Sequence, residues 1–120
     1  MEPFEKLEVW QLSHELTLKT YKMLNQFPVE EKYNLVSQMR RSICSVPTNI
    51  VEGHSSLSTK GFIRFLGIAR ASASEYYYQL ILSRDLGYIA LKEFNVMSYE
   101  TKRIIKMINS LIETLHKKCI

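Results

Sequence analysis

The chain has 120 residues, 46% hydrophobic and 23% charged, with three prolines, four glycines and a formal net charge of +4. This length is typical of a single domain, residues 1–120, that buries a core without disulfides or metals, and the composition excludes disordered and collagen-like chains. No run of 18 apolar residues occurs and the acidic, polar start is unlike a signal peptide, so we expect a cytoplasmic protein without a membrane span.

The first predicted helix covers about residues 4–26. Its apolar residues recur at steps of three and four and form two neighbouring files, more than one core-facing stripe requires. Phe27-Pro28 ends this helix, because a residue that precedes proline is pushed out of the helical region. His14 lies on one of the apolar files, so we interpret it as a packed core histidine.

The second predicted helix, residues 33–53, carries a proline near its middle. Pro47 cannot donate a backbone hydrogen bond and crowds the carbonyl of Ile43, so a kink is predicted there. Beside the apolar stripe lies one continuous polar line: Gln38, Arg41, Ser45, Asn49 and Glu52. The line is either a solvated face or a set of buried polar groups. Gly53 suits the C-cap position.

The third predicted helix begins at Ser58, a suitable N-cap residue, and runs to about Leu86, before Gly87. One file of this helix reads as core-facing: Phe65, Ile68, Ser72, Glu75, Gln79, Leu82 and Leu86. A carboxylate in that file needs a partner. We therefore predict a buried polar network that fixes helix register around Pro47: Gln38, Arg41, Asn49, Glu52 and Glu75.

The fourth predicted helix, about residues 92–118, has a regular apolar seam: Phe94, Met97, Thr101, Ile104, Ile108, Leu111 and Leu115. Four long helices with short connections predict an all-α, up-down-up-down antiparallel four-helix bundle. Tyr76, Tyr77 and Tyr78 point about 100° apart, so at least one must be exposed or lie at an interface. The surplus of apolar surface favours self-association.

Motifs that carry catalysis or metal binding are missing from the sequence. The three histidines form no zinc or di-iron spacing, and there is no glycine-rich phosphate loop or nucleophile elbow. We therefore predict no catalytic residue, no metal, no cofactor and no small-molecule substrate. Cys44 and Cys119 are expected to form no disulfide.

Positive charge is concentrated in the later part of the chain. Residues 1–32 hold six acids and four bases, a net charge of −2, whereas residues 33–120 hold six acids and twelve bases, a net charge of +6. Arginines and lysines pair with phosphates and tyrosines stack on unpaired bases. The candidate nucleic-acid-binding residues are Lys60, Arg64, Arg70, Tyr77, Arg84, Lys102, Arg103 and Lys106. The alternative is that these side chains only solvate the bundle exterior.

Four segments in this order resemble one known family: FEKLEVWQLSHEL, FPVEEKYNL, QMRRSICSVPTNIVEG and STKGFIRFLGIARASASE. The chain resembles the four-helix-bundle proteins encoded by intervening sequences of bacterial 23S rRNA genes. This resemblance implies a cytoplasmic homopentamer with no known catalytic chemistry. It is similar also to the accessory proteins of diversity-generating retroelements, basic pentamers that associate with a reverse transcriptase and nucleic acid.

The residues that match the family pattern are mostly structural by this comparison: Gln38, Arg40, Arg41, Ser45, Pro47, Asn49, Glu52, Gly53, Ser72 and Glu75. Four positions depart from the pattern. Ser56 replaces a usual basic residue, Gly61 a usual acid, and glycine is replaced at Ala71 and Asn34. The resemblance therefore carries no RNA-contact role to the loop that contains Ser56.

The sequence thus predicts a non-enzymatic, ring-forming helical bundle that binds RNA, DNA or a nucleic-acid enzyme such as a reverse transcriptase through a basic surface. The alternative is a structural oligomeric scaffold or protein-interaction module that binds no nucleic acid.

Overall fold

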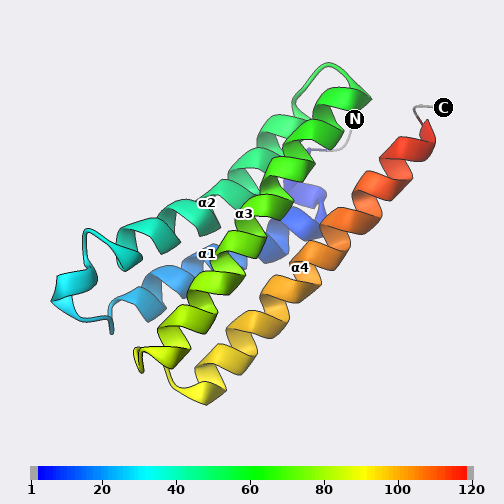
Figure 1. Cartoon of the computed structure of the whole chain (residues 1–120). Coiled ribbons are helices and arrows are strands. Elements are labelled where there is room, and N and C mark those ends of the chain that lie inside the picture. Colours follow the sequence, from blue (N-terminus) through cyan, green and yellow to red (C-terminus); the bar gives the residue numbers. More distant parts are fainter. Residues whose placement is uncertain (1–2, 119–120) are drawn as a thin grey trace.

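The computed structural model describes residues 3–118, so Cys119 lies outside the described residues. Its helices are α1 (Glu8–Leu24), α2 (Leu35–His54), α3 (Thr59–Asp85) and α4 (Leu91–Lys118), with short 3-10 helices η1 (Phe4–Lys6) and η2 (Val29–Glu31). Residues 3–118 contain no strand. The predicted all-α four-helix bundle is therefore confirmed (Figure 1).

Consecutive helices run in opposite directions along a molecule of 48 × 23 × 20 Å (Figure 1). Each helix packs against the next one in the chain, and α4 returns to pack against α1. Side-chain contacts show that α4 and α1 also run in opposite directions. Lys19 contacts Glu100, and Gln26, seven residues after Lys19, contacts Glu93, seven residues before Glu100. The α1–α2 and α3–α4 connections therefore lie together at one end of the bundle.

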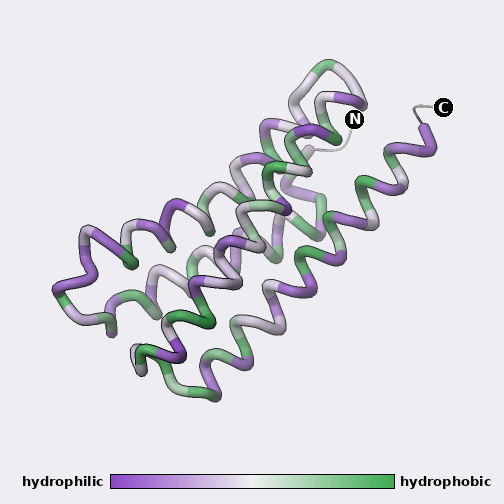
Figure 2. Tube along the Cα trace, in the orientation of Figure 1, coloured by the Kyte–Doolittle hydropathy of each residue, from purple (hydrophilic) through white to green (hydrophobic). Residues whose placement is uncertain are grey.

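The predicted seam of α4 faces the core. Six of its seven residues are buried, and Leu111 is half-buried. Figure 2 shows the cause in the sequence, since hydrophobic and hydrophilic segments alternate along each helix. The core that results is mainly aliphatic, with Tyr76 as its largest fully buried side chain.

The core-facing file predicted for α3 is wrong by one position. The buried residues of α3 are Leu66, Ala69, Ala73, Tyr76, Gln79, Leu80 and Ser83, and only Gln79 among them belongs to the predicted file. Ile68 is 40% and Leu86 49% exposed. One residue along a helix is a rotation of about 100°. The two alanines occupy the core side because their small side chains let neighbouring helices approach.

One of two predicted helix caps is confirmed and the other is wrong. Ser58 is the N-cap of α3, and its Oγ accepts a hydrogen bond from the Gly61 amide at 3.0 Å, as predicted. Gly53 is not a C-cap, because α2 continues to His54. A Cβ at Gly53 would lie 2.8 Å from Phe62 Cδ1 and 2.9 Å from Phe65 Cβ, so this glycine allows α3 to pack closely.

Pro47 is buried inside α2, which is helical on both sides of it. The kink at Pro47 stays a prediction.

A side-chain hydrogen bond joins the two connections at one end of the bundle. The Tyr88 hydroxyl, between α3 and α4, donates to Glu31 Oε2 in η2 at 2.7 Å. This bond lowers the pKa of Glu31 and raises the pKa of Tyr88. Gly87, with φ of +79°, supplies the left-handed backbone that the turn before Tyr88 requires.

Candidate nucleic-acid interface

Polar and aromatic side chains meet across the junction of α3 and α4. Arg70 Nη1 donates to Asn109 Oδ1 at 2.9 Å, and Lys102 Nζ lies 5.1 Å from the centroid of the Tyr77 ring. A step of seven residues along α3 is thus matched by a step of seven residues backwards along α4. Antiparallel packing therefore brings Arg70, Tyr77 and Lys102 onto one line.

Lys106 belongs to the same line. It follows Lys102 by four residues and precedes Asn109 by three, and these spacings share one face of a helix. We call this set the α3–α4 strip: Arg70, Tyr77, Lys102 and Lys106. Its three cations are exposed and its tyrosine is half-buried. The strip therefore combines three groups that can bind phosphate with one partly open aromatic ring.

Arg84 is already engaged with its own surroundings. Its Nε lies 2.9 Å from Asp85 Oδ1, and its guanidinium carbon lies 4.5 Å from the centroid of the Phe94 ring. The hydrogen bond with Asp85 raises the pKa of Arg84. Because a carboxylate offsets its charge, Arg84 adds little to the strip.

Lys60 and Arg64 are exposed near the start of α3 but on another side of the helix. Arg64 precedes Arg70 by six residues, which places it about 120° around the axis. Its guanidinium carbon packs 4.5 Å from the centroid of the Phe65 ring. These two cations therefore form a separate patch on the outward face of α3.

Arg103 faces away from the strip, because it lies one residue and about 100° beyond Lys102. It lines a small cavity of about 30 Å³ between α1 and α4, together with Glu15 and Glu100. The structure thus brings together four of the eight sequence-predicted residues. Arg84 continues their line seven residues beyond Tyr77, but Asp85 offsets its charge. Lys60, Arg64 and Arg103 lie elsewhere. Nucleic-acid binding itself stays a prediction.

The predicted buried network is wrong for four of its five residues, which are exposed: Gln38, Arg41, Glu52 and Glu75. Asn49 is half-buried, and its Nδ2 donates to Ser45 O at 2.8 Å and to Ser45 Oγ at 2.9 Å. Glu75 Oε2 accepts only a long hydrogen bond of 3.4 Å from Gln79 Nε2 among the bonds found in residues 3–118. For Glu75 the error follows from the core-facing file of α3, which lies one position away. Gln38, Arg41 and Glu52 lie on the exposed part of the polar line of α2, which is the solvated-face alternative.

Smaller polar groups join α2 to α3 instead. Ser42 Oγ donates to Gln79 Oε1 at 2.6 Å, and both residues are buried. Ser72 Oγ donates to Ser45 Oγ at 2.8 Å. The polar line of α2 contains Ser45, and the predicted file of α3 contains Ser72 and Gln79. Helix periodicity alone does not show which residues of the two helices meet.

His14 is exposed, so the core position predicted for it is wrong. Its ring stacks on Trp10, with centroids 5.0 Å apart and planes at 7°. A histidine and a tryptophan four residues apart lie on the same helix face, which explains the contact. The apolar file that suggested burial is therefore the edge of α1 beside α2.

No helix among residues 3–118 combines the length and apolarity that crossing a membrane requires.

Comparison with known proteins gives a family and a solved relative. The profile of the 23S rRNA-intervening sequence proteins matches residues 5–110. A crystal structure of a protein with unknown function from the S23 ribosomal protein family of Bacteroides thetaiotaomicron VPI-5482 is similar, with a TM-score of 0.82 and 27% identity. The match covers 88% of this chain and 95% of that chain. No curated protein matches the chain.

Proposed function

Since the chain belongs to the family of 23S rRNA-intervening sequence proteins, as its motifs predicted, we propose that it is a non-enzymatic helical bundle that binds RNA through the α3–α4 strip. In this proposal the protein is cytoplasmic and acts as a homopentameric ring. A nucleic-acid enzyme that works on the same RNA, such as a reverse transcriptase, is the protein partner that fits this role.

The observation that carries the proposal is the kind of neighbour that holds two of the three cations of the strip. Arg70 is held by the neutral amide of Asn109, and Lys102 by the ring of Tyr77. These contacts orient both side chains without offsetting their charge, in contrast to the contact of Arg84 with Asp85. A held cation whose charge is not offset is suited to a phosphate, and the half-buried tyrosine is suited to an unpaired base.

Ring formation is supported by apolar side chains that the single chain leaves open. Ile68 is 40%, Tyr78 59% and Leu86 49% exposed along α3, and Tyr99 on α4 is 67% exposed. Exposed apolar side chains of this size are the kind that an interface between copies of the chain would cover. An assembly that covers them would also present several strips together, which strengthens binding to one RNA.

The test is the salt dependence of binding to a fluorescently labelled single-stranded RNA, followed by anisotropy. If six phosphates of the single strand are neutralised per ring, affinity should fall by roughly 300-fold between ~50 and ~200 mM salt, and by more if further phosphates are neutralised. Binding that is absent, or that does not change with salt, would favour the scaffold alternative. Light scattering tests the ring separately, since a monomer at micromolar concentration contradicts it.

A further inference from the structure

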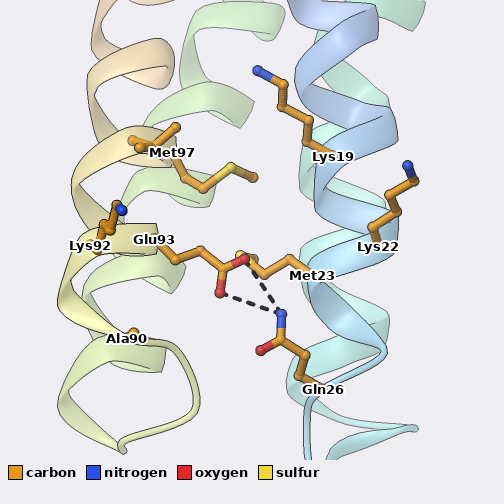
Figure 3. A pocket seen from close by; sticks show the side chains of 9 residues that line it. Lys19, Lys22, Met23, Gln26, Ala90, Lys92, Glu93 and Met97 are labelled. Atoms are coloured by element: carbon orange, nitrogen blue, oxygen red, sulfur yellow. Dashed lines mark hydrogen bonds between the residues drawn. The ribbon is translucent and has the colours of Figure 1, made fainter.

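A groove of about 560 Å³ lies between the second half of α1 and the first turns of α4 (Figure 3). It was not apparent from the sequence, because its two walls come from opposite ends of the chain. No residue of the α3–α4 strip lines it. The lining residues are Lys19, Lys22, Met23, Gln26, Ala90, Lys92, Glu93, Val96 and Met97.

Two polar contacts cross the groove and mark its ends. Gln26 Nε2 donates to both carboxylate oxygens of Glu93 at 3.4 Å, as Figure 3 shows, and Lys19 Nζ donates to Glu100 Oε1 at 2.6 Å. The contacts are seven residues apart on each helix, which corresponds to about 10 Å, or two helical turns. We call the stretch of groove between these two contacts the window. Its length equals two turns of a docked helix.

The floor of this window is apolar. Met23 and Met97 extend into it from opposite helices (Figure 3) and are themselves only 2% and 4% exposed. Val96 at the edge is 50% exposed. Flexible, polarizable thioethers adapt to the shape of a docking side chain, as they do in other helix-binding grooves. The floor is therefore suited to aliphatic or aromatic anchors.

The rim is positively charged. Lys22 on α1 and Lys92 on α4 stand on opposite sides of the groove (Figure 3). Of the two nearby carboxylates, Glu100 is paired with Lys19, whereas Glu93 is held by the neutral amide of Gln26 and keeps its charge. Lys22 and Lys92 outnumber Glu93, so the rim keeps a net positive charge. None of the nine lining residues is aromatic, so the groove offers no ring on which a base could stack. Its chemistry is complementary to an apolar surface flanked by acids.

We propose that this groove docks an acidic amphipathic helix of a partner protein. Apolar side chains one turn apart on that helix enter the window over Met23 and Met97. Its carboxylates pair with Lys22 and Lys92 on the two rims. This site is separate from the α3–α4 strip, so either proposal can fail without the other.

The experiment follows the methionine methyl groups of the full chain by NMR, with ¹³C-methyl methionine. The probe is a synthetic helical peptide with leucines at positions i, i+3, i+4 and i+7 and glutamates on both flanks. The signals of Met23 and Met97 should shift on titration, while Met39, fully buried on α2, should not. The same peptide with lysine in place of each glutamate should bind at least tenfold more weakly.

A pair of charge variants tests the rim. Lys22→Glu with Lys92→Glu should weaken peptide binding by tenfold or more, whereas Lys60→Glu with Lys117→Glu, an equal change of charge at exposed positions elsewhere, should leave it unchanged. Should the first variant fold poorly by circular dichroism, the comparison of the two peptides on the native chain still decides.

Three results would overturn the proposal. The first is that Met23 and Met97 do not shift at millimolar peptide, or shift equally with the lysine peptide. The second is that they shift with protein concentration alone, which would assign the groove to a second copy of the chain. The third is that single-stranded RNA shifts them, which would assign the groove to nucleic acid.

Discussion

The hydroxyl groups of Thr20 and Tyr76 lie 2.5 Å apart in the core and join α1 to α3, two helices that are not neighbours in the bundle. The Thr20 hydroxyl also contacts the Leu16 carbonyl at 2.8 Å, to which it can only donate. A hydroxyl has one hydrogen, so Tyr76 is the donor to Thr20. The buried tyrosine therefore has a partner for its hydroxyl in a core that is otherwise mainly aliphatic.

Tyr76→Phe should lower the free energy of unfolding by about 1 kcal/mol, because it removes this hydrogen bond while keeping the ring. Thr20 keeps its bond to Leu16, so no donor is left unpaired. Urea denaturation followed by circular dichroism measures the change. Tyr33→Phe, at a side chain 87% exposed, is the control and should have no effect. Equal stability of the Tyr76 variant and the native chain would contradict the role given to the bond.

The free energy of unfolding should decrease at alkaline pH because of Tyr76. Burial raises the pKa of Tyr76 above its ordinary value, so the unfolded chain loses this proton first. The stabilisation is complete below about pH 10 and is lost as pH rises further, by at most about 1.4 kcal/mol per pH unit. Urea denaturation between pH 9 and pH 11 should show a smaller loss in Tyr76→Phe than in the native chain. The other tyrosines are the same in both proteins, so their contributions cancel in the comparison.

Two glycines in helices should respond oppositely to alanine. At Gly53 the new Cβ would meet Phe65 Cβ at 2.9 Å, and a Cβ cannot move without its backbone, so Gly53→Ala should destabilise by roughly 1–3 kcal/mol. At Gly67 nothing lies within 4 Å, so Gly67→Ala should stabilise by about 1 kcal/mol through helix propensity. Thermal and urea denaturation of both variants check this. Stabilisation by both would mean that α2 and α3 are less closely packed at Gly53.

Removing the charges of the strip should weaken RNA binding and its salt dependence together. The variant combines Arg70→Gln, Lys102→Gln and Lys106→Gln. The slope of log K against log salt should become shallower by roughly 2 for each subunit whose strip contacts the RNA, since each lost single-strand phosphate contact contributes about 0.7. The control removes three charges from α1 and from the side of α4 that faces α1: Lys22→Gln, Lys92→Gln and Arg103→Gln. Equal losses in both variants would show that only net charge matters.

Most of the fold could be predicted from the sequence, because the spacing of apolar residues within each helix indicates which of its faces is buried. The α4 seam is clear since its buried positions are large and regularly spaced. In α3 the pattern misleads, because Ala69 and Ala73 bury little surface while the larger Ile68 and Leu86 stay partly exposed. A pattern weighted by side-chain size therefore chooses the wrong file, and the misplaced burial of Glu75 follows from it.

The candidate site could be predicted only in part, because it depends on how two helices align. The register of α3 against α4 is what places Arg70, Tyr77 and Lys102 on one line. This register cannot be deduced from the residue spacing within either helix. The pairing of Arg84 was available from the sequence, since Asp85 is its next residue. The α1–α4 groove was out of reach for the same reason as the strip, as Met23 and Met97 are 74 residues apart.

The contact of Tyr88 with Glu31 makes the two ends of the molecule unequal. The hairpin of α1 and α2 and the hairpin of α3 and α4 are fastened to each other by this hydrogen bond at the end opposite the α2–α3 connection (Figure 1). At the other end residues 55–58 join the same two hairpins covalently. Loss of the Tyr88 hydroxyl would therefore leave the hairpins attached through the chain at one end alone, and thermal fraying should begin where Glu31 and Tyr88 now meet.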